Sequence, residues 1–236
     1  SVTGDLIGGN LIEGSGNAGN ITSTSVTLTG GTLDGEVMGG SYIRGSNESA
    51  IGTTNVLVSG GTLKSVANKA QYVLGGGKAL VYSNGQNATL SIDTTNVTIS
   101  DAVEVLGGGV IGGSLAKGTG TGTATVSVTN ANTTILGGTQ IAGVVGGGVA
   151  ENYNTSTGKV SSSVEESQLT ISGGAIDALR YGAQISADAT SATAVVGGGV
   201  ASFKGSGGTV TSSVTTANTT INGGTINGHV IAGGMA

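Results

Sequence analysis

Apolar and polar residues alternate in short runs along most of this chain. Val97 and Ile99, for example, flank Thr98, and the same alternation recurs many times. A period of two is typical of a β-strand with one buried face. No window carries a sustained helical stripe, and the density of Gly and Thr disfavours helix throughout. The pattern therefore predicts an all-β protein.

One of these runs recurs six times, usually ending in a Gly-Gly pair, and its third residue, such as Ile99, is the anchor from which we count the internal repeat. The third copy carries Ser100-Asp101 in place of the glycines. The copies are Val26-Thr27-Leu28-Thr29-Gly30-Gly31, Val56-Leu57-Val58-Ser59-Gly60-Gly61, Val97-Thr98-Ile99-Ser100-Asp101, Thr133-Thr134-Ile135-Leu136-Gly137-Gly138, Leu169-Thr170-Ile171-Ser172-Gly173-Gly174 and Thr219-Thr220-Ile221-Asn222-Gly223-Gly224.

Two further pieces complete each repeat. The second piece is a pair of apolar residues before a glycine cluster, and the third is a polar alternating strand that ends seven residues before the next anchor. The third pieces end at Ile92, Val128, Val164 and Val214. The second pieces are Val73-Leu74-Gly75-Gly76-Gly77, Val105-Leu106-Gly107-Gly108-Gly109, Val144-Val145-Gly146-Gly147-Gly148 and Val195-Val196-Gly197-Gly198-Gly199, with weaker forms at Val37-Met38-Gly39-Gly40 and Ile231-Ala232-Gly233-Gly234.

The spacing of the pieces locates the insertions. The count from glycine triple to the end of the third piece is 17, 21, 18 and 17, whereas the count from anchor to triple is 17, 8, 11 and 26. Insertions therefore occur at the same corner of each coil, between the anchor and the glycine triple. The two large inserts run over 64–72 and 177–193.

These observations predict that each repeat is one coil of three short strands, turned by glycines that allow positive φ or close backbone approach. Asn84-Gly85 predicts a hairpin over 81–87, with equivalent tips at 117–122, 151–159 and 202–208. Four asparagines precede their anchors by three residues, where stacked coils would align them in a hydrogen-bonded ladder; they are Asn55, Asn96, Asn132 and Asn218.

Composition narrows the class of protein. Glycine supplies 48 of 236 residues, proline and cysteine are absent, and only one Phe and five Tyr occur. The abundance of Val, Ile and Thr argues against disorder, and the missing Gly-X-Y period excludes collagen. A net charge of −5 without a basic run argues against nucleic acid as a partner. No stretch is apolar enough to span a membrane, so we expect no direct membrane insertion.

The repeats resemble the β-solenoid passenger regions of bacterial autotransporters and related large surface adhesins. The resemblance rests on Val/Ile-Thr-Ile-x-Gly-Gly followed by Val-x-Gly-Gly-Gly, in a chain with few aromatic residues and no Cys. It implies a right-handed parallel β-helix (β-solenoid) of about six rungs with protruding loops or hairpins. It also implies outer-membrane export and an extracellular or cell-surface location. Because the chain breaks off inside repeats at both ends, we expect a single domain over 1–236 that is a segment of a longer protein, or copies that stack head to tail.

Candidate chemistry is sparse. No phosphate-loop pattern follows any glycine run, and 30–35 lacks the central glycine of a calcium-binding repeat. Glu165 and Glu166 are adjacent on an alternating strand, so we expect opposite orientations and no catalytic dyad. His229, the only histidine, is interpreted as a surface residue. We expect no catalytic residues, no metal and no cofactor.

Binding is the remaining kind of function, and the two long inserts are where a repeat protein would place it. The candidate binding residues are Lys64, Lys69, Tyr72, Arg180, Tyr181 and Asp188. The expected function is a non-enzymatic structural or adhesive stalk that presents loops to glycans or proteins of host or neighbouring bacterial cells. The alternatives are a self-assembling fibre or surface-layer subunit, and a polysaccharide-active β-helix enzyme.

Overall fold

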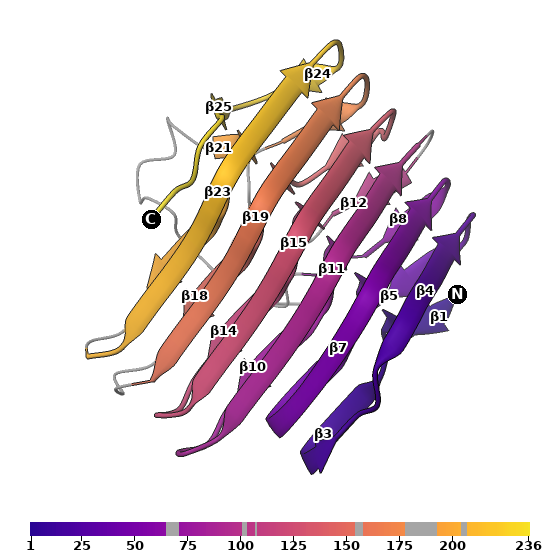
Figure 1. The fold of residues 1–236 in the computed structure, drawn as a ribbon. Helices are drawn as coiled ribbons and strands as arrows, with labels where there is room; N and C mark the ends of the chain where they lie inside the picture. The colour runs from indigo at the N-terminus through magenta and orange to yellow at the C-terminus, as the bar shows by residue number, and fades with distance from the viewer. Residues whose placement is uncertain (65–70, 101–102, 107, 154–157, 178–192, 204–206) are drawn as a thin grey trace.

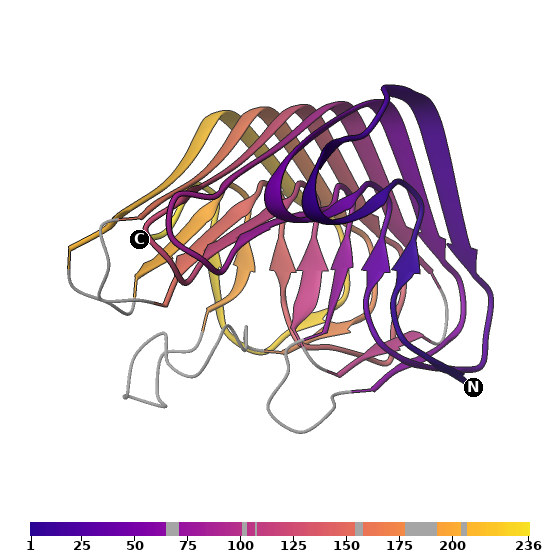
Figure 2. The same cartoon turned by 90° about the horizontal axis from the view of Figure 1, so that it is seen from below.

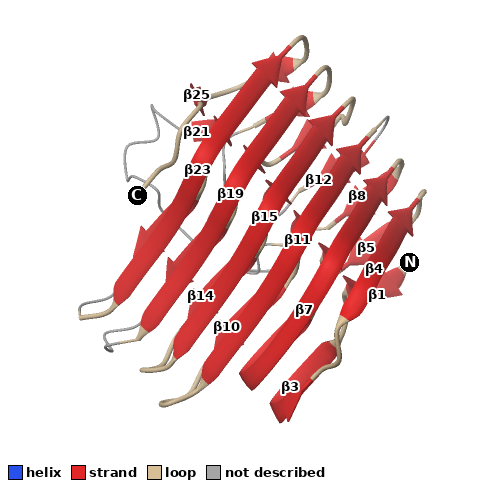
Figure 3. Cartoon of the chain, viewed as in Figure 1, coloured by secondary structure: helices blue, strands red, loops and turns tan. Residues whose placement is uncertain are grey.

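The computed structural model describes residues 1–64, 71–100, 103–106, 108–153, 158–177, 193–203 and 207–236. All regular structure in these residues is β-strand, joined by turns and short loops (Figures 1 and 3). The prediction of an all-β protein is confirmed.

The strands form three sheets, which we name A, B and C. Sheet A contains β1 (Val2–Thr3), β5 (Thr32–Asp34), β8 (Gly61–Leu63), β12 (Val103–Val105), β16 (Gln140–Ile141), β20 (Ala175–Ile176) and β24 (Thr225–Ile226). Sheet B contains β2 (Leu6–Ile7), β6 (Val37–Met38), β9 (Tyr72–Leu74), β13 (Gly109–Ile111), β17 (Val144–Val145), β21 (Thr193–Val196) and β25 (His229–Ile231). Sheet C contains β3 (Leu11–Asn17), β4 (Ile21–Leu28), β7 (Tyr42–Val58), β10 (Lys78–Val81), β11 (Asn87–Ile99), β14 (Leu115–Gly118), β15 (Thr123–Ile135), β18 (Val149–Asn152), β19 (Lys159–Ile171), β22 (Val200–Phe203) and β23 (Thr209–Ile221).

The chain visits the sheets in the order A, B, C and then returns to A, and we call one such passage a circuit. Each strand pairs in parallel with its counterpart one circuit away, as β11 does with β7 on one side and β15 on the other. The long strands of sheet C therefore lie side by side in chain order, and the sheets wrap around a common interior (Figures 1 and 2).

The long strands correct the prediction of three short strands in each repeat. The third piece and the following anchor form one strand of 13 residues in β11, β15, β19 and β23. Their seven-residue spacing is constant because no loop separates them. In β11, Ala88, Leu90 and Ile92 are buried, then two residues in succession are not, and burial resumes at Thr95. This interruption of the alternation divides each long strand into two inward-facing halves.

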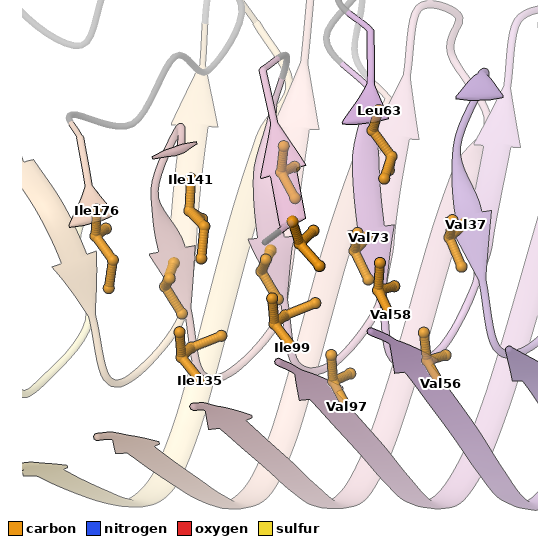
Figure 4. Packing of buried hydrophobic residues seen from close by; sticks show 14 of the residues in the cluster. Val37, Val56, Val58, Leu63, Val73, Val97, Ile99, Ile135, Ile141 and Ile176 are labelled. Atoms are coloured by element: carbon orange, nitrogen blue, oxygen red, sulfur yellow. The ribbon is translucent and has the colours of Figure 1, made fainter. Parts of the chain in front are cut away.

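The second halves enclose what we call the wide core. Here Val97 and Ile99 of β11 meet side chains of sheets A and B, such as Leu63 and Val73 (Figure 4). Large β-branched and leucine side chains fill this space, as expected where three sheets converge.

The first halves enclose the narrow core, in which they face β10, β14 and β18. Small side chains are frequent at this interface, including Ala79 and Ala116 on one side and Ala88 and Ala124 on the other. Alanine fits here because only two layers of backbone approach each other.

Glycine clusters between sheet B and the short strands of sheet C separate the two cores. A Cβ on Gly75 would overlap the carbonyl oxygen of Gly112 and lie 2.7 Å from Cγ2 of Val97, and a Cβ on Gly76 would lie 2.9 Å from Cδ1 of Ile92. Close approach of the next circuit and of the long strand, rather than positive φ, therefore requires glycine here. We call this constriction the glycine pinch.

The alignment of the glycine cluster in the fourth circuit was predicted wrongly. Sheet B pairs Leu74 with Ile111, so the counterparts of Gly75 and Gly76 are Gly112 and Gly113, not glycines of the 107–109 triple. With this register, the count from the cluster to Val128 falls from the irregular 21 to 16, in line with the other circuits.

The Gly-Gly pairs after the anchors have a different role, because their second residue adopts positive φ. This holds for Gly31, Gly61, Gly138, Gly174 and Gly224, with φ between 85° and 114°. These glycines turn the chain from sheet C into sheet A, as the sequence predicted.

The predicted hairpins are wrong. Gly85 has a φ of 72°, so a turn does form at Asn84-Gly85. However, β10 and β11 on either side of it each pair in parallel with the next circuit, and all strand pairs among the described residues are parallel. The two strands face each other through Ala79 and Ala88 across the narrow core, so the connection is an arch. In β7 the same bend takes place inside a continuous strand at Gly45.

Hydrogen-bonded ladders join successive circuits. Asn96 Nδ2 donates to Asn55 Oδ1, and Asn132 Nδ2 donates to Asn96 Oδ1, both over 3.0 Å. The predicted asparagine ladder is confirmed for these three residues, and Gln168 occupies the next position. At the glycine pinch, the buried Thr95 hydroxyl donates to the carbonyl oxygen of Gly112 over 2.7 Å.

Candidate binding face

A third apolar cluster lies outside the two cores, in the corner between sheet B and the short strands of sheet C. Sheet B turns Val73 into the wide core, so the next residue, Leu74, faces the other way. Leu74 and its counterparts pack here with Leu115 and Val149 of β14 and β18. We call this region the outer corner.

Charged and aromatic side chains line the outer corner in two groups. In the first, Lys78 Nζ forms an ion pair with Glu36 Oε2 and lies 5.5 Å from the centre of the Tyr72 ring. In the second, Lys117 Nζ lies 3.6 Å from Glu151 Oε2 and 4.4 Å from the Tyr153 ring centre. The carboxylates are almost fully buried, with 8% of the Glu36 side chain and 2% of the Glu151 side chain exposed. The paired cations offset part of the cost of burying these carboxylates.

A third pair lies at the exposed edge of the same region. The Arg44 guanidinium lies 4.7 Å from the ring centre of Tyr82 and 3.8 Å from Oε1 of Glu13. The four tyrosines of the described chain, Tyr42, Tyr72, Tyr82 and Tyr153, all belong to this region, because Tyr42 packs against the same apolar cluster. The tyrosine rings of the described residues thus lie together on one face.

Burial sets the protonation of these groups. Desolvation raises the pKa of Tyr42 to about 12 and raises the pKa of Tyr153 above its ordinary value, where the nearby Glu151 carboxylate adds to the effect. Both phenols stay protonated at neutral pH, and Tyr153 donates to Glu151 Oε2 over 3.1 Å. Burial also raises the pKa of Glu36, and the ammonium of Lys78 opposes that shift.

The candidate binding residues predicted from the inserts are only partly placed. Tyr72 is 4% exposed and belongs to the outer corner. Lys64 is exposed just after β8, and its backbone N–H donates to the carbonyl of Leu33. Lys69, Arg180, Tyr181 and Asp188 lie outside the described residues.

Sequence reasoning missed most of the residues of the outer corner. A signal was present, because Tyr82 and Tyr153 each stand five residues after the last residue of a glycine cluster, at Gly77 and Gly148. The incorrect alignment of the cluster in the fourth circuit hid this regularity. It also concealed that Lys117 aligns with Leu80, and Leu80 with Arg44, in successive circuits.

The other predicted sites acquire simple structural explanations. Glu165 and Glu166 occupy the interruption in β19 where two successive residues are not buried, so the expectation of opposite orientations is wrong. Their alternation fails because the long strand changes from one core to the other at this point. His229 is exposed on β25, as expected. Asp34, in the calcium-like sequence, accepts a hydrogen bond from Gln71 Nε2 over 3.2 Å.

The spacing of the buried carboxylates limits their chemistry. Glu36 precedes β6 and Glu151 lies on β18, which places them three circuits apart, or about 14 Å at the usual strand spacing. The two carboxyl groups of a glycosidase lie about 5 to 9.5 Å apart. Glu36 and Glu151 therefore do not form such a pair.

The part of the chain that the structure describes contains no group of three or more His, Cys, Asp or Glu residues that could hold a metal ion. The same part of the chain contains no helix that is long and apolar enough to cross a membrane.

A depression of about 280 Å³ opens on sheet C between β3 and β4. Its lining includes Asn20, Ser49 and Ser91 and one carboxylate, Glu48. No histidine belongs to this lining.

The fold defines the chain as an all-β protein built from parallel sheets. No protein-family profile, curated protein or solved structure matches it.

Proposed function

We propose that the chain is a right-handed parallel β-solenoid of about six rungs and serves as a non-enzymatic structural or adhesive stalk. The observation that carries this proposal is the uninterrupted parallel register of sheet C. Ile51, Ile92, Val128, Val164 and Val214 are aligned in five successive circuits without a slip. A chain that adds one strand to each sheet per circuit grows along a single axis, by about 4.8 Å per circuit.

Several features support a stiff rod rather than a flexible string of repeats. Each circuit hydrogen-bonds to its neighbours in three sheets, and side-chain ladders add further bonds between circuits. The glycine pinch fixes the cross-section, because it holds the long strand and the short strands at one separation. Nearest-neighbour stacking of this kind is how repeat proteins build extended scaffolds.

The cellular setting of the proposal is a bacterial cell-surface or secreted protein. It follows from the resemblance of the repeats to autotransporter passenger regions. In that setting a stalk presents side chains along its length to glycans or proteins of host or neighbouring cells.

A self-assembling fibre is the second candidate. Two observations favour it: only 9% of the residues are charged, and the same backbone register recurs from circuit to circuit. A second copy could therefore add to the stack through the bonds that already join the circuits.

Electron microscopy of the purified chain over a concentration series separates the two candidates. A stalk predicts short rods of one length at every concentration. Long filaments that grow with concentration would overturn the stalk and favour the fibre.

A second experiment tests adhesion. Beads coated with the chain should retain bacterial or epithelial cells above the level of beads coated with heat-denatured chain. Equal retention by both kinds of bead would contradict an adhesive role and leave a purely structural stalk.

A further inference from the structure

Two of the cation–aromatic pairs on the outer corner share one geometry. Arg44 on β7 lies over the ring of Tyr82, which follows β10 in the next circuit. Lys117 on β14 lies over the ring of Tyr153, which follows β18 in the next circuit. In both pairs the cation belongs to one column of sheet C, since Arg44 aligns with Leu80 and Leu80 with Lys117. The same unit therefore recurs along the stack.

The two copies of the unit lie two circuits apart. Val81, Gly118 and Asn152 are aligned in successive circuits, and Tyr82, Thr119 and Tyr153 directly follow them. The two rings thus stand in one column, about 9.5 Å apart along the stacking axis. This separation is close to the length of a disaccharide in an extended β-1,4-linked polysaccharide.

Both copies of the unit reach the surface. Tyr82 is 42% exposed, Tyr153 is partly buried, and the side chains of Arg44 and Lys117 are 51% and 32% exposed. Because each ring already contacts a cation, part of its side-chain entropy is lost before a ligand binds.

The charges of the column are balanced. Arg44 is paired with Glu13, and Lys117 is paired with Glu151. An anionic ligand would have to compete with these carboxylates, whereas an uncharged, hydroxyl-rich ligand can accept hydrogen bonds from the cations and donate to the exposed carboxylate of Glu13. Each cation covers one face of its ring, so a sugar would stack on the opposite face, where its C–H groups, which carry partial positive charge, suit the negative ring face.

We propose that the column of Tyr82 and Tyr153, with Arg44 and Lys117, binds an extended neutral polysaccharide that lies along the stacking axis. This inference deepens the adhesive function proposed above and rests on it, and it names both the surface and the chemical class of the partner. It moves the binding surface from the inserts to the regular part of the fold.

The test is calorimetric titration of the full chain with cellohexaose, chitohexaose and β-1,4-mannohexaose, with polygalacturonate as the anionic comparison. We expect binding of at least one neutral hexasaccharide. Tyr82→Leu should weaken that binding at least tenfold, and the double variant Tyr82→Leu, Tyr153→Leu should abolish it.

Two controls separate the ring from general damage. Tyr82→Phe keeps the ring and should retain affinity within about twofold of the parent chain. Leu57→Ala changes an exposed apolar residue in the second half of β7, away from this column, and should leave affinity unchanged. Circular dichroism spectra and melting temperatures check that each variant is folded.

Binding to none of the neutral oligosaccharides, binding to polygalacturonate alone, or binding that survives loss of both rings would overturn the inference. Each of these results is distinguishable from failure of the stalk. Rods in the microscope and cells retained on beads would still support the proposed function without this partner.

Discussion

The wide core and the narrow core are enclosed by the same long strands, yet they contain side chains of different size. In β15, the half that faces the narrow core buries Ala124, Val126 and Val128, and the half that faces the wide core ends at Ile135. Three sheets meet at the wide core, whereas two layers approach each other across the narrow core. The identity of each inward residue therefore follows the local distance between backbones, and not only the apolar pattern.

The glycine pinch produces this difference. It brings the end of sheet B against the middle of the long strand and leaves a separate space on either side. We therefore expect three kinds of change to lower the free energy of unfolding. They are an atom added at the glycine pinch, volume removed from the wide core and volume added to the narrow core.

The largest effect is expected from Gly75→Ala. The new Cβ would overlap the backbone oxygen of Gly112, which cannot move without displacing the next circuit. We expect a loss of more than about 3 kcal/mol in the free energy of unfolding, measured by urea denaturation with circular dichroism. Gly30→Ala is the matched control, because no atom lies within 4 Å of its Cβ. Equal midpoints for the two variants would contradict the pinch.

Ile135→Ala removes volume from the wide core. Ile135 is completely buried among side chains of all three sheets, so truncation should leave a cavity and cost about 2 to 5 kcal/mol. The same denaturation experiment measures it. A change below about 1 kcal/mol would mean that the wide core is loosely packed.

Ala124→Ile adds volume to the narrow core, where Ala124 is completely buried. Overpacking between two layers should cost about 1 to 3 kcal/mol. Ala50→Ile provides the control, since Ala50 is only partly buried and lies on the outer side of β7. That change should alter stability by less than about 0.5 kcal/mol. A stabilising effect of Ala124→Ile would show that the narrow core has unfilled space.

The smallest effect is expected from Thr95→Val, which keeps the shape of the side chain at the pinch and removes its hydroxyl. The carbonyl of Gly112 would lose a buried hydrogen bond, so we expect a cost of about 1 to 2 kcal/mol. Thr95→Ser, which keeps the donor, should recover part of this loss. The melting temperatures of the two variants measure this recovery. Equal melting temperatures would show that the Thr95 hydroxyl does not stabilise the fold.

The sequence predicted the all-β structure, the glycine turns after the anchors and the asparagine ladder, because each depends on local rules. Period-two alternation indicates a half-buried strand. A Gly-Gly pair after an anchor indicates a turn, and Gly61 and Gly174 adopt the positive φ that such a turn requires. The arch at 82–86 was interpreted as a hairpin because Asn-Gly favours a turn without specifying whether the flanking strands pair with each other or with the next circuit.

The outer corner could not be predicted in the same way. Lys78 and Glu36 are separated by 42 residues and meet only because successive circuits stack in one register. The fourth circuit contains two glycine clusters within a few residues, and local patterning cannot decide which one aligns with Gly75. The register between successive circuits, rather than residue type, therefore determines which residues meet in the outer corner.

The central claim is that the circuits stack in parallel along one axis, and spin-label distances test it most directly. The chain has no cysteine, so Ser23→Cys can be combined with Asn130→Cys, Glu166→Cys or Thr216→Cys, which occupy one column of sheet C three, four and five circuits away. Electron–electron double resonance should give narrow distance distributions that increase by about 4.8 Å from each pair to the next, over a span of about 14 to 24 Å before the label tethers are added. Distances that do not increase with circuit number would contradict the account.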